Sequence, residues 1–441
     1  MATTTQPDST GSKAAQPAHV CNVALVGFGT VGSSVARILV ERPNTGLRLT
    51  HVYNRNVARK KVDWLPPEVV WTENIDDVLS SNADIVVEVM GGLQPTEDWV
   101  RRALTSGKSV VTANKQLIAL CGSELIGLAR QMHQQIEFGA SVAGGVPVIS
   151  GLHEGLAGDE LFRIWGILNG TCNYILSQIE ASGVPFATAL REAQKLGFAE
   201  ADPTEDIDGF DARAKLAILT RIGLRCNVAA DSILARSISA IDAVDFEFAN
   251  LLGCTIRQIS RAELKDGQLF AAVQPALVQL TSPLARVEGS QNLVMATGVY
   301  GGETVFGGHG AGGHPTAVAV VSDILAIARG KQAGDTPVAQ SGEKSPPLAE
   351  KSPAVTFDFT TKNYLRFLVK DRPGIIASVA TILARSEINI DSVLQKPGFP
   401  KSHLPLLITL EECRASLVDQ ALEQINALDF MVQPCLHLPI L

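Results

Sequence analysis

In the N-terminal third of the chain, apolar residues follow two alternating patterns. Short β-rich runs occupy residues 20–26 (VCNVALV), 47–53, 83–89 (ADIVVEV) and 109–112 (SVVT). Between these runs, apolar residues recur at the spacing of one helix face, as in SSVARILVER. Strands that alternate with helices are typical of a parallel, doubly wound sheet, so residues 20–150 are predicted to form a Rossmann-type α/β domain.

The pattern changes after about residue 150. Longer helical patterns cover residues 172–182, 186–196 and 208–224, and an apolar β-rich run covers residues 293–299. This mixture of longer helices and scattered strands predicts a second domain, of mixed α/β type, over residues 151–330.

Two segments lack any periodic pattern. Residues 1–19 are rich in Thr, Ser, Pro and Gln and lack the charged and apolar regions of a signal peptide, which predicts a disordered tail. Residues 331–355 combine Gly, Ser, Pro and charge, which predicts a linker. Residues 356–441 are then expected to form a third unit.

Composition narrows the class of protein. Of the 441 residues, 46% are hydrophobic and 19% are charged, and the formal net charge is -8. Because no dense Lys/Arg stripe is present, we expect no nucleic-acid partner. No uncharged apolar stretch reaches the roughly 18 residues of a membrane helix, so no membrane association is expected. Seven scattered cysteines without a C-x-x-C pair predict buried thiols in a reducing compartment, so the expected location is cytoplasmic.

A glycine motif follows the first predicted strand and opens a predicted helix. It consists of Gly27, Phe28, Gly29, Thr30, Val31 and Gly32. In a dinucleotide site, the first glycine permits the tight turn, the second admits the pyrophosphate and the third lets the helix pack closely on the strand. A glycine-rich turn without a ligand is the alternative, but the flanking strand and helix favour dinucleotide binding.

The second predicted strand bears on the choice between NAD and NADP. An NAD site usually ends this strand with an acid that binds the ribose 2′-OH, whereas residues 51–56 read HVYNRN. The missing acid and the cations that follow favour NADP, with Arg55 as the main candidate for a 2′-phosphate contact. A solvated basic loop explains any single one of these cations equally well.

A dense group of acids lies in the second domain. Residues 196–219, LGFAEADPTEDIDGFDARAKLAIL, place six carboxylates ahead of one lysine. These acids could form a solvated surface, a metal site or part of an active site, and the pattern alone excludes none of the three. Asp211 and Lys215 are four residues apart and would share a helix face, although an ordinary exposed ion pair, worth about 0.3–0.5 kcal/mol, explains this spacing as well.

A set of motifs in a fixed order carries a family resemblance. Behind the glycine motif come VTANK at residues 111–115, NGTCNYIL at 169–176, the acidic stretch, and GAGGHPTA at 310–317. This set resembles homoserine dehydrogenase. The resemblance implies reversible hydride transfer between a nicotinamide cofactor and L-homoserine, which is interconverted with L-aspartate 4-semialdehyde. It also implies that the second domain binds substrate and supports dimerisation, in a homodimer or homotetramer.

The resemblance also assigns roles to individual residues. Lys215 matches the family's proton donor, and Lys115 matches a lysine that contacts both cofactor and substrate. The matching substrate-binding residues are Glu200 and Asp211, with weaker support for Asp206, and the matching cofactor-binding residues include Gly197 and Gly312. If the two lysines lie close together, each is expected to lower the pKa of the other.

The remaining acids of the stretch have structural explanations. Asp202 precedes Pro203 and suits a turn, Asp208 is expected to be the N-cap of the following helix, and Glu205 is expected to be solvated.

One position departs from the family. The family commonly binds a monovalent cation through a glutamate carboxylate and backbone carbonyls near the hinge between domains. Here Gly139 occupies the glutamate's position, while the carbonyls of Val142, Gly144 and Val146 remain. The expectation of a sodium or potassium site is therefore weakened.

The third unit carries its own resemblance. YLRFLVKDRPGII at residues 364–376, followed by a predicted helix and INIDSV at 388–393, resembles an ACT domain, a ferredoxin-like β-α-β-β-α-β module. The turn at residues 371–374 could present backbone N-H groups to a carboxylate. The resemblance implies an amino-acid effector such as threonine, and a dimerisation module that binds nothing is the alternative.

Two other functions remain open at this stage. A non-catalytic amino-acid sensor on a Rossmann scaffold is one, although the joint presence of Lys115, Glu200, Asp211 and Lys215 argues against it. A dehydrogenase of another small semialdehyde is the other.

Overall fold

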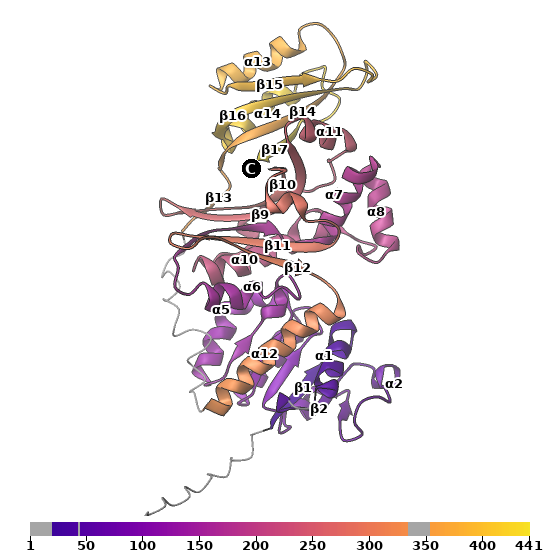
Figure 1. Cartoon of the computed structure of the whole chain (residues 1–441), viewed down its shortest axis with the longest axis vertical. Helices are drawn as coiled ribbons and strands as arrows, with labels where there is room; N and C mark the ends of the chain where they lie inside the picture. The colour runs from indigo at the N-terminus through magenta and orange to yellow at the C-terminus, as the bar shows by residue number, and fades with distance from the viewer. Residues whose placement is uncertain (1–19, 43–44, 334–352) are drawn as a thin grey trace, which may run out of the picture.

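The computed structural model describes residues 20–42, 45–333 and 353–441. The predicted tail at residues 1–19 and most of the predicted linker lie outside the described residues. Three units follow one another along the longest axis of the molecule, with the N-terminal unit at one end and the C-terminal unit at the other (Figure 1).

The N-terminal unit is built on a six-stranded sheet in the order β3-β2-β1-β4-β5-β6. Every neighbouring pair in this sheet is parallel. The strands are β1 Cys21–Val26, β2 Leu47–Tyr53, β3 Val70–Thr72, β4 Ile85–Glu88, β5 Ser109–Thr112 and β6 Ile136–Glu137. The predicted Rossmann-type sheet is confirmed, and β3 and β6 are the short edge strands that the hydrophobic pattern did not show.

Helices cover this parallel sheet, and one of them comes from far along the chain. The local helices are α1 Thr30–Glu41, α2 Val57–Lys60, α3 Ile75–Leu79, α4 Thr96–Thr105 and α5 Lys115–Gln131. The distant helix is α12, Gly313–Ala333, whose buried Val320, Ile324 and Ile327 share a core with Val23 and Val35. The end of the segment predicted as a second domain therefore returns to the N-terminal unit.

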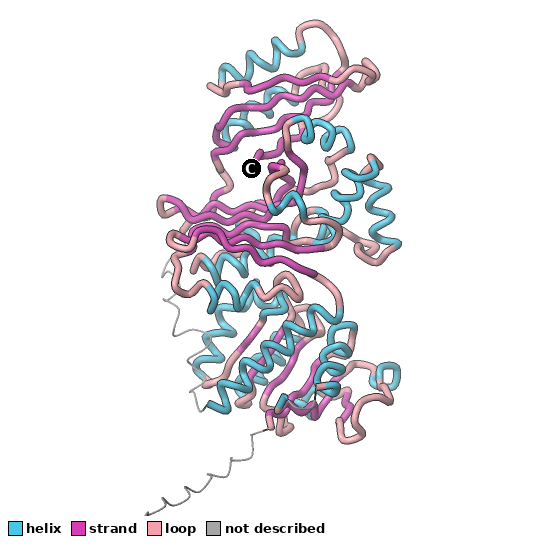
Figure 2. Tube along the Cα trace, viewed as in Figure 1, coloured by secondary structure: helices cyan, strands magenta, loops and turns pink. Residues whose placement is uncertain are grey.

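The middle and C-terminal units share one eleven-stranded sheet. Its main path runs β12-β11-β7-β9-β10-β17-β14-β16-β15, and β8 and β13 also pair with β10. Its first strands are β7 Leu161–Ile167, β8 Leu234–Ala235, β9 Cys254–Lys265, β10 Gln268–Gln279, β11 Gln291–Gly298 and β12 Gly302–His309. In Figure 2 these strands form a broad layer in the middle of the molecule, with helices below it and the C-terminal unit above it.

The longest hairpin of the sheet, β9-β10, follows from its turn chemistry. Asp266 and Gly267 both have positive φ, 50° and 74°, as a tight two-residue turn between right-twisted strands requires. Twelve residue pairs then run from Lys265 and Gln268 to Cys254 and Gln279.

The helices of the middle unit carry much of the site described below. They are α6 Val148–Ser150, α7 Gly170–Ser182, α8 Phe186–Lys195, α9 Thr204–Ile207, α10 Phe210–Gly223 and α11 Ala243–Leu251. Three of these correspond to the predicted helices at residues 172–182, 186–196 and 208–224. The third prediction is corrected at its start, because Gly209, at φ 83°, precedes the helix and Asp208 makes no capping bond.

The C-terminal unit has the predicted β-α-β-β-α-β order of an ACT domain. After β13 Val355–Thr356 it contains β14 Thr360–Val369, α13 Ile375–Arg385, β15 Ile390–Gln395, β16 Leu404–Arg414, α14 Ala415–Asn426 and β17 Leu436–Ile440. Its last strand pairs with β14 on one side and meets β10 on the other, where the Leu441 amide donates to the Leu277 carbonyl at 2.8 Å. The ACT unit is thus continuous with the middle unit.

Among the described residues, no helix is long and apolar enough to cross a membrane. All seven cysteines are free, and Cys21, Cys172, Cys226 and Cys254 are buried.

Candidate active site

The glycine turn has the geometry that its sequence predicted. Gly27 has φ 108° and ends β1, and Gly29 precedes α1 with open space where a side chain would project. A Cβ on Gly32 would lie 2.1 Å from the Gly27 carbonyl oxygen, so α1 packs directly on the turn. The open space at Gly29, beside the N-terminus of α1, suits the approach of a pyrophosphate.

Replacing Gly32 with alanine is expected to destabilise the protein by about 1–3 kcal/mol, because the new methyl group meets backbone that has no room to retreat. Urea denaturation measures the change. Gly127→Ala in α5 is the matched control, since a Cβ there meets nothing within 4 Å. That variant should be neutral or slightly stabilising, because alanine favours a helix interior over glycine. Equal stabilities of the two variants would contradict the packing role of Gly32.

Arg55 is the candidate for the 2′-phosphate contact, and this role stays a prediction. Arg55 is exposed and follows the end of β2, whose last residue, Tyr53, accepts a hydrogen bond from the Gly27 amide at 3.0 Å. The second strand thus ends beside the glycine turn, so Arg55 is near the region of a dinucleotide's adenosine ribose.

Lys115, Lys215 and Asp211 form a compact cluster. Lys115 Nζ lies 2.5 Å from Asp211 Oδ1, and Lys215 Nζ lies 2.7 Å from Oδ2 of the same carboxylate. Lys215 Nζ also donates to the Leu168 carbonyl at 2.9 Å. The Asp211 side chain is only 5% exposed, against 14% for Lys215 and 37% for Lys115, so the carboxylate is the most buried member of the cluster.

Asp206 joins this cluster through an amide that the sequence analysis did not single out. Asn169 Nδ2 donates to Asp206 Oδ1 at 2.7 Å and to Asp211 Oδ2 at 2.9 Å. Asn169 Oδ1 accepts from the Cys172 amide, so the same side chain caps helix α7. The Asn-Gly-Thr start of a helix was the available signal, because asparagine is a preferred N-cap.

The electrostatics of the cluster follow from burial and charge pairing. Burial alone would raise the pKa of Asp211, but the Lys215 and Lys115 ammonium groups hold it well below its usual range. Burial also opposes the charged form of Lys115, yet Asp211 raises the pKa of this lysine overall. The expectation that proximity lowers both lysine pKa values is therefore wrong for Lys115, because an anion lies between the two cations. Burial raises the pKa of Asp206.

Lys115 is the first residue of α5, and a buried network fixes this helix start. Asn114 caps α5 by accepting from the Leu117 amide, while its Nδ2 donates to the Gly92 carbonyl at 2.6 Å. Thr112 Oγ1 accepts from the Asn114 amide and donates to Glu88 at 2.6 Å. A lysine at a helix N-terminus is unfavourable, because its positive charge opposes the helix dipole. The ion pair with Asp211 offsets this cost. The fold itself does not require a lysine at this position.

Other assigned residues lie outside the cluster. Glu200 is exposed, and its backbone carbonyl accepts from Gln194 Nε2 at 3.0 Å. Gly197 is also exposed, in the loop after α8, with φ 79°. The substrate role of Glu200 and the cofactor role of Gly197 stay predictions. Glu205 is exposed, as expected, and its charge contributes to the raised pKa of Lys115.

A cleft of about 380 Å³ joins the lysine cluster to the glycine turn. Thr30 and Val31 line it from α1, Lys115 and Lys215 from the cluster, and Gly312 from the loop before α12. Gly312 has φ 118°, which suits glycine at this bend. A dinucleotide and a small substrate can therefore meet within one cleft.

A neighbouring acid, Asp323, fills the space into which a side chain at position 139 would project. The Gly139 amide donates to Asp323 Oδ2 at 2.8 Å, and a Cβ on Gly139 would lie 2.8 Å from Asp323 Oδ1. Burial raises the pKa of Asp323 to about 7 and that of nearby Glu137 to about 8.

The candidate carbonyls lie in the next turn, where the Val146 carbonyl accepts from the Val148 amide at 2.8 Å. Among the described residues, no group of three or more His, Cys, Asp or Glu side chains could hold a metal ion. No step of the chemistry below depends on a cation.

Fold and cleft together define a nicotinamide-dependent oxidoreductase with an ACT domain. Sequence models agree with this division: "Homoserine dehydrogenase, NAD binding domain" matches residues 27–139, "Homoserine dehydrogenase" matches 147–325, and "ACT domain" matches 363–430. The chain belongs to the homoserine dehydrogenase family.

Named relatives and solved structures are similar over most of their lengths. The homoserine dehydrogenase of Bacillus subtilis is 38% identical over 382 residues, which cover 85% of this chain and 87% of the relative. The crystal structure of a homoserine dehydrogenase from Thiobacillus denitrificans has a TM-score of 0.88 at 33% identity, covering 96% of this chain and 98% of that one. A hyperthermophilic archaeal homoserine dehydrogenase mutant in complex with NADPH has a TM-score of 0.61 at 28% identity, covering 70% and 97%.

Proposed function

We propose that this protein interconverts L-homoserine and L-aspartate 4-semialdehyde, with Lys215 as the acid/base at the reacting oxygen. The observation that supports the proposal is the cluster of Lys115, Asp211 and Lys215. Its two lysines line the same cleft as the glycine turn. The bound nicotinamide supplies or accepts the hydride at C4 of the substrate. The chain's own residues must then move one proton and hold the substrate in place.

Lys215 is suited to move this proton. Its Nζ is fixed by Asp211 and the Leu168 carbonyl, and it lines the cleft. In homoserine oxidation, the neutral amine form of Lys215 accepts the hydroxyl proton as hydride leaves C4 for the nicotinamide, and in the reverse direction the ammonium form of Lys215 returns the proton to the forming alkoxide. Lys115, at the start of α5, places a second positive charge beside the same oxygen and stabilises the negative charge that develops there.

Acidic residues suit the other end of the substrate. The ammonium group of homoserine is held well by charge-assisted hydrogen bonds to fixed carboxylates. Asp206 is one candidate for this contact, supported by the Asn169 side chain that bridges it to Asp211. Glu200 is the second candidate, and its exposed side chain would have to turn toward the substrate.

The direct test is an assay of the purified protein with homoserine and each nicotinamide cofactor. We expect homoserine-dependent reduction of the cofactor and little reaction with other small hydroxy amino acids. Activity confined to another substrate would favour a dehydrogenase of a different semialdehyde. A folded protein without any cofactor reduction would favour the non-catalytic sensor.

We propose that NADP is the preferred cofactor, with Arg55 binding the 2′-phosphate. The archaeal relative in complex with NADPH supports a phosphorylated cofactor in this family. Arg55→Ala is expected to raise KM for NADPH by about 10- to 100-fold, the loss of one charge-assisted contact, with little effect on KM for NADH. Arg48→Ala, another exposed arginine of the same strand region, is the control. Equal changes for both cofactors in Arg55→Ala would contradict the assignment.

The remaining family properties are part of the same proposal. The ACT unit is proposed to lower activity when an end-product amino acid such as threonine binds, with a coupling of about 1–3 kcal/mol. Assembly as a homodimer or homotetramer, the cytoplasmic location and a monovalent cation stay predictions.

A further inference from the structure

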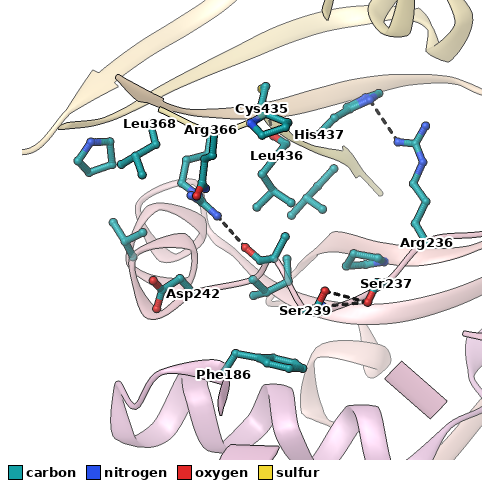
Figure 3. Close-up of a pocket in the computed structure, with 18 of the residues that line it drawn as sticks. Phe186, Arg236, Ser237, Ser239, Asp242, Arg366, Leu368, Cys435, Leu436 and His437 are labelled. Atoms are coloured by element: carbon teal, nitrogen blue, oxygen red, sulfur yellow. Dashed lines mark hydrogen bonds between the residues drawn. The ribbon is translucent and has the colours of Figure 1, made fainter. Parts of the chain in front are cut away.

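A second large cavity lies where the ACT unit meets the middle unit (Figure 3). Its volume is about 1210 Å³. Residues 236–244 form one wall, and β14, β17 and α14 of the ACT unit form the other. Neither the lysines of the catalytic cleft nor the ACT turn at residues 371–374 line it.

One buried carboxylate joins the two walls. Asp245, in α11, is fully buried and accepts from Tyr364 Oη at 2.7 Å and from Arg366 Nε at 2.6 Å, both in β14. Its other oxygen accepts from the Asp242 amide at 2.8 Å, which closes the capping box of α11. Arg366 Nη2 also donates to the Ala240 carbonyl at 2.8 Å, as Figure 3 shows.

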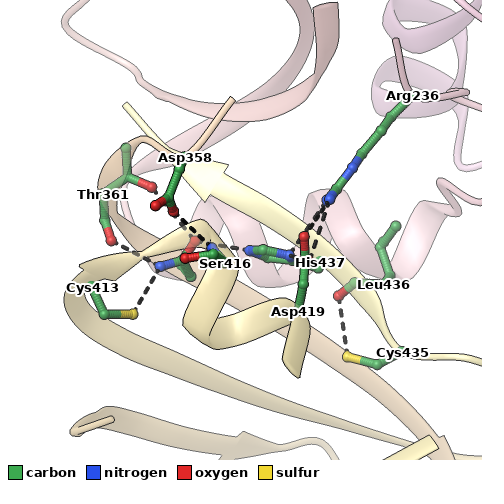
Figure 4. Close-up of polar contacts among 10 residues, drawn as sticks. Arg236, Asp358, Thr361, Cys413, Ser416, Asp419, Cys435, Leu436 and His437 are labelled. Atoms are coloured by element: carbon green, nitrogen blue, oxygen red, sulfur yellow. Dashed lines mark hydrogen bonds and ion pairs between the residues drawn. The ribbon is translucent and has the colours of Figure 1, made fainter. Parts of the chain in front are cut away.

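A second contact holds the other end of this wall. Arg236 Nη2 lies 3.1 Å from Asp419 Oδ2, and His437 Nδ1 lies 3.3 Å from Oδ1 of the same residue (Figure 4). Burial lowers the pKa of His437, although its contact with Asp419 opposes this shift. Residues 236–241, which we term the connecting segment, are therefore held by the ACT unit at both ends.

The connecting segment also touches the catalytic site. The Ile238 amide donates to the Ile207 carbonyl at 3.0 Å, at the end of α9. Ile207 adjoins Asp206, which Asn169 bridges to Asp211. A movement of the connecting segment would therefore change the position of Asp206 through one backbone hydrogen bond.

The free polar groups that line the cavity, one on each wall, have opposite charges. Arg366 Nη1 has no hydrogen-bond partner among the described residues, and the Asp242 carboxylate is exposed beyond its contacts with the Ala243 and Asp245 amides at the start of α11. The two residues are neighbours because both bond to Asp245. A guanidinium N-H suits a carboxylate and a carboxylate suits an ammonium group, so an α-amino acid zwitterion matches both. The cavity exceeds the volume of one amino acid, which leaves room for water beside the ligand.

We propose that this cavity, between the ACT unit and the connecting segment, is the binding site of the amino-acid effector. The ligand's carboxylate binds Arg366 and its ammonium group binds Asp242. Because Arg366 also holds Ala240, binding shifts the connecting segment and thereby the substrate-binding Asp206. The inference rests on the proposed regulation and assigns it a site and a route.

The test uses the full-length protein with L-threonine as the probe, in calorimetric titrations and in homoserine oxidation assays. Asp242→Asn retains the helix cap, since asparagine is an equally good N-cap, but removes the charge. We expect threonine to bind the unmodified protein and to bind Asp242→Asn about 10-fold or more weakly. Inhibition, expressed relative to each variant's own uninhibited rate, should weaken in parallel. N-acetyl-L-threonine, which lacks the ammonium group, should not bind.

Asp371→Asn, in the ACT turn, is the matched variant at the alternative site, and it should bind threonine as the unmodified protein does. Loss of binding in Asp371→Asn with retention in Asp242→Asn would overturn the proposal, as would an absence of threonine binding to the unmodified protein. Calorimetry reads binding without turnover. A protein that binds threonine in this pattern but does not oxidise homoserine would therefore contradict the proposed function alone.

Discussion

Replacing Lys215 with alanine is expected to lower kcat for homoserine oxidation by about 10²- to 10⁴-fold, the usual contribution of a positioned acid/base. The variant loses the ammonium group that donates to Asp211 and to the Leu168 carbonyl inside the cleft. The dissociation constant of the cofactor should change little, because the glycine turn is untouched. Steady-state kinetics and a separate cofactor titration measure the two effects.

Lys195→Ala is the matched control for this variant. Lys195 is exposed in the last turn of α8, outside the cleft. This variant should retain full activity. Circular dichroism must show that Lys215→Ala is folded, and a folded Lys215→Ala variant with full activity would exclude Lys215 as the acid/base.

The second large effect is expected from Asp211→Asn. The substitution leaves two ammonium groups beside a neutral amide, in a site where the original carboxylate is 5% exposed. Breaking a buried ion pair in this way costs about 3–5 kcal/mol, and partial exposure of Lys115 favours the lower end of that range. We expect the free energy of unfolding at pH 7 to fall by about 3 kcal/mol in urea denaturation.

The stabilisation by Asp211 should depend on pH with a defined sign. Because its pKa in the folded protein is held below the value of the unfolded chain, the carboxylate stabilises the fold at pH values above the unfolded pKa. That contribution begins to decline as pH falls below about 4, the unfolded pKa of an aspartate, and is lost fully only below the depressed pKa of the folded state. The difference between Asp211→Asn and the unmodified protein should therefore narrow from pH 7 to pH 3.

Asp231→Asn provides the matched comparison. Asp231 pairs with Arg213, but its side chain is 86% exposed. Removing this exposed pair should change stability by less than about 0.5 kcal/mol. If both variants lose the same stability, or if the difference for Asp211→Asn is independent of pH, Asp211 is not the charge centre of the cluster.

The sequence predicted the parallel sheet and the ACT unit well because their signals are local. The β1 run, the Gly27 turn and the α1 periodicity are adjacent in the chain, and β1 is buried on both faces whereas α1 buries one. The edge strand β6 has only two residues, Ile136 and Glu137, which is too short for a pattern. The return of α12 to pack on α1 depends on tertiary contacts that periodicity does not encode.

The candidate site was predictable in part for similar reasons. The spacing of Asp211 and Lys215 gave their shared helix face, whereas the contact of Lys115 with Asp211 joins residues 96 positions apart in different units. Asn169 was missed because its side chain bridges acids in two other helices, and a sequence pattern shows only its capping role. Glu88 was missed because it lies within an apolar strand, where it binds Thr112.

Because β17 pairs with β10, part of the central sheet can form only late in synthesis. β10 lies at residues Gln268–Gln279, while its neighbour β17, Leu436–Ile440, is synthesised only after the whole of the intervening chain. The central sheet is therefore incomplete until β17 has left the ribosome, and the edge of β10 is available to other chains in the meantime.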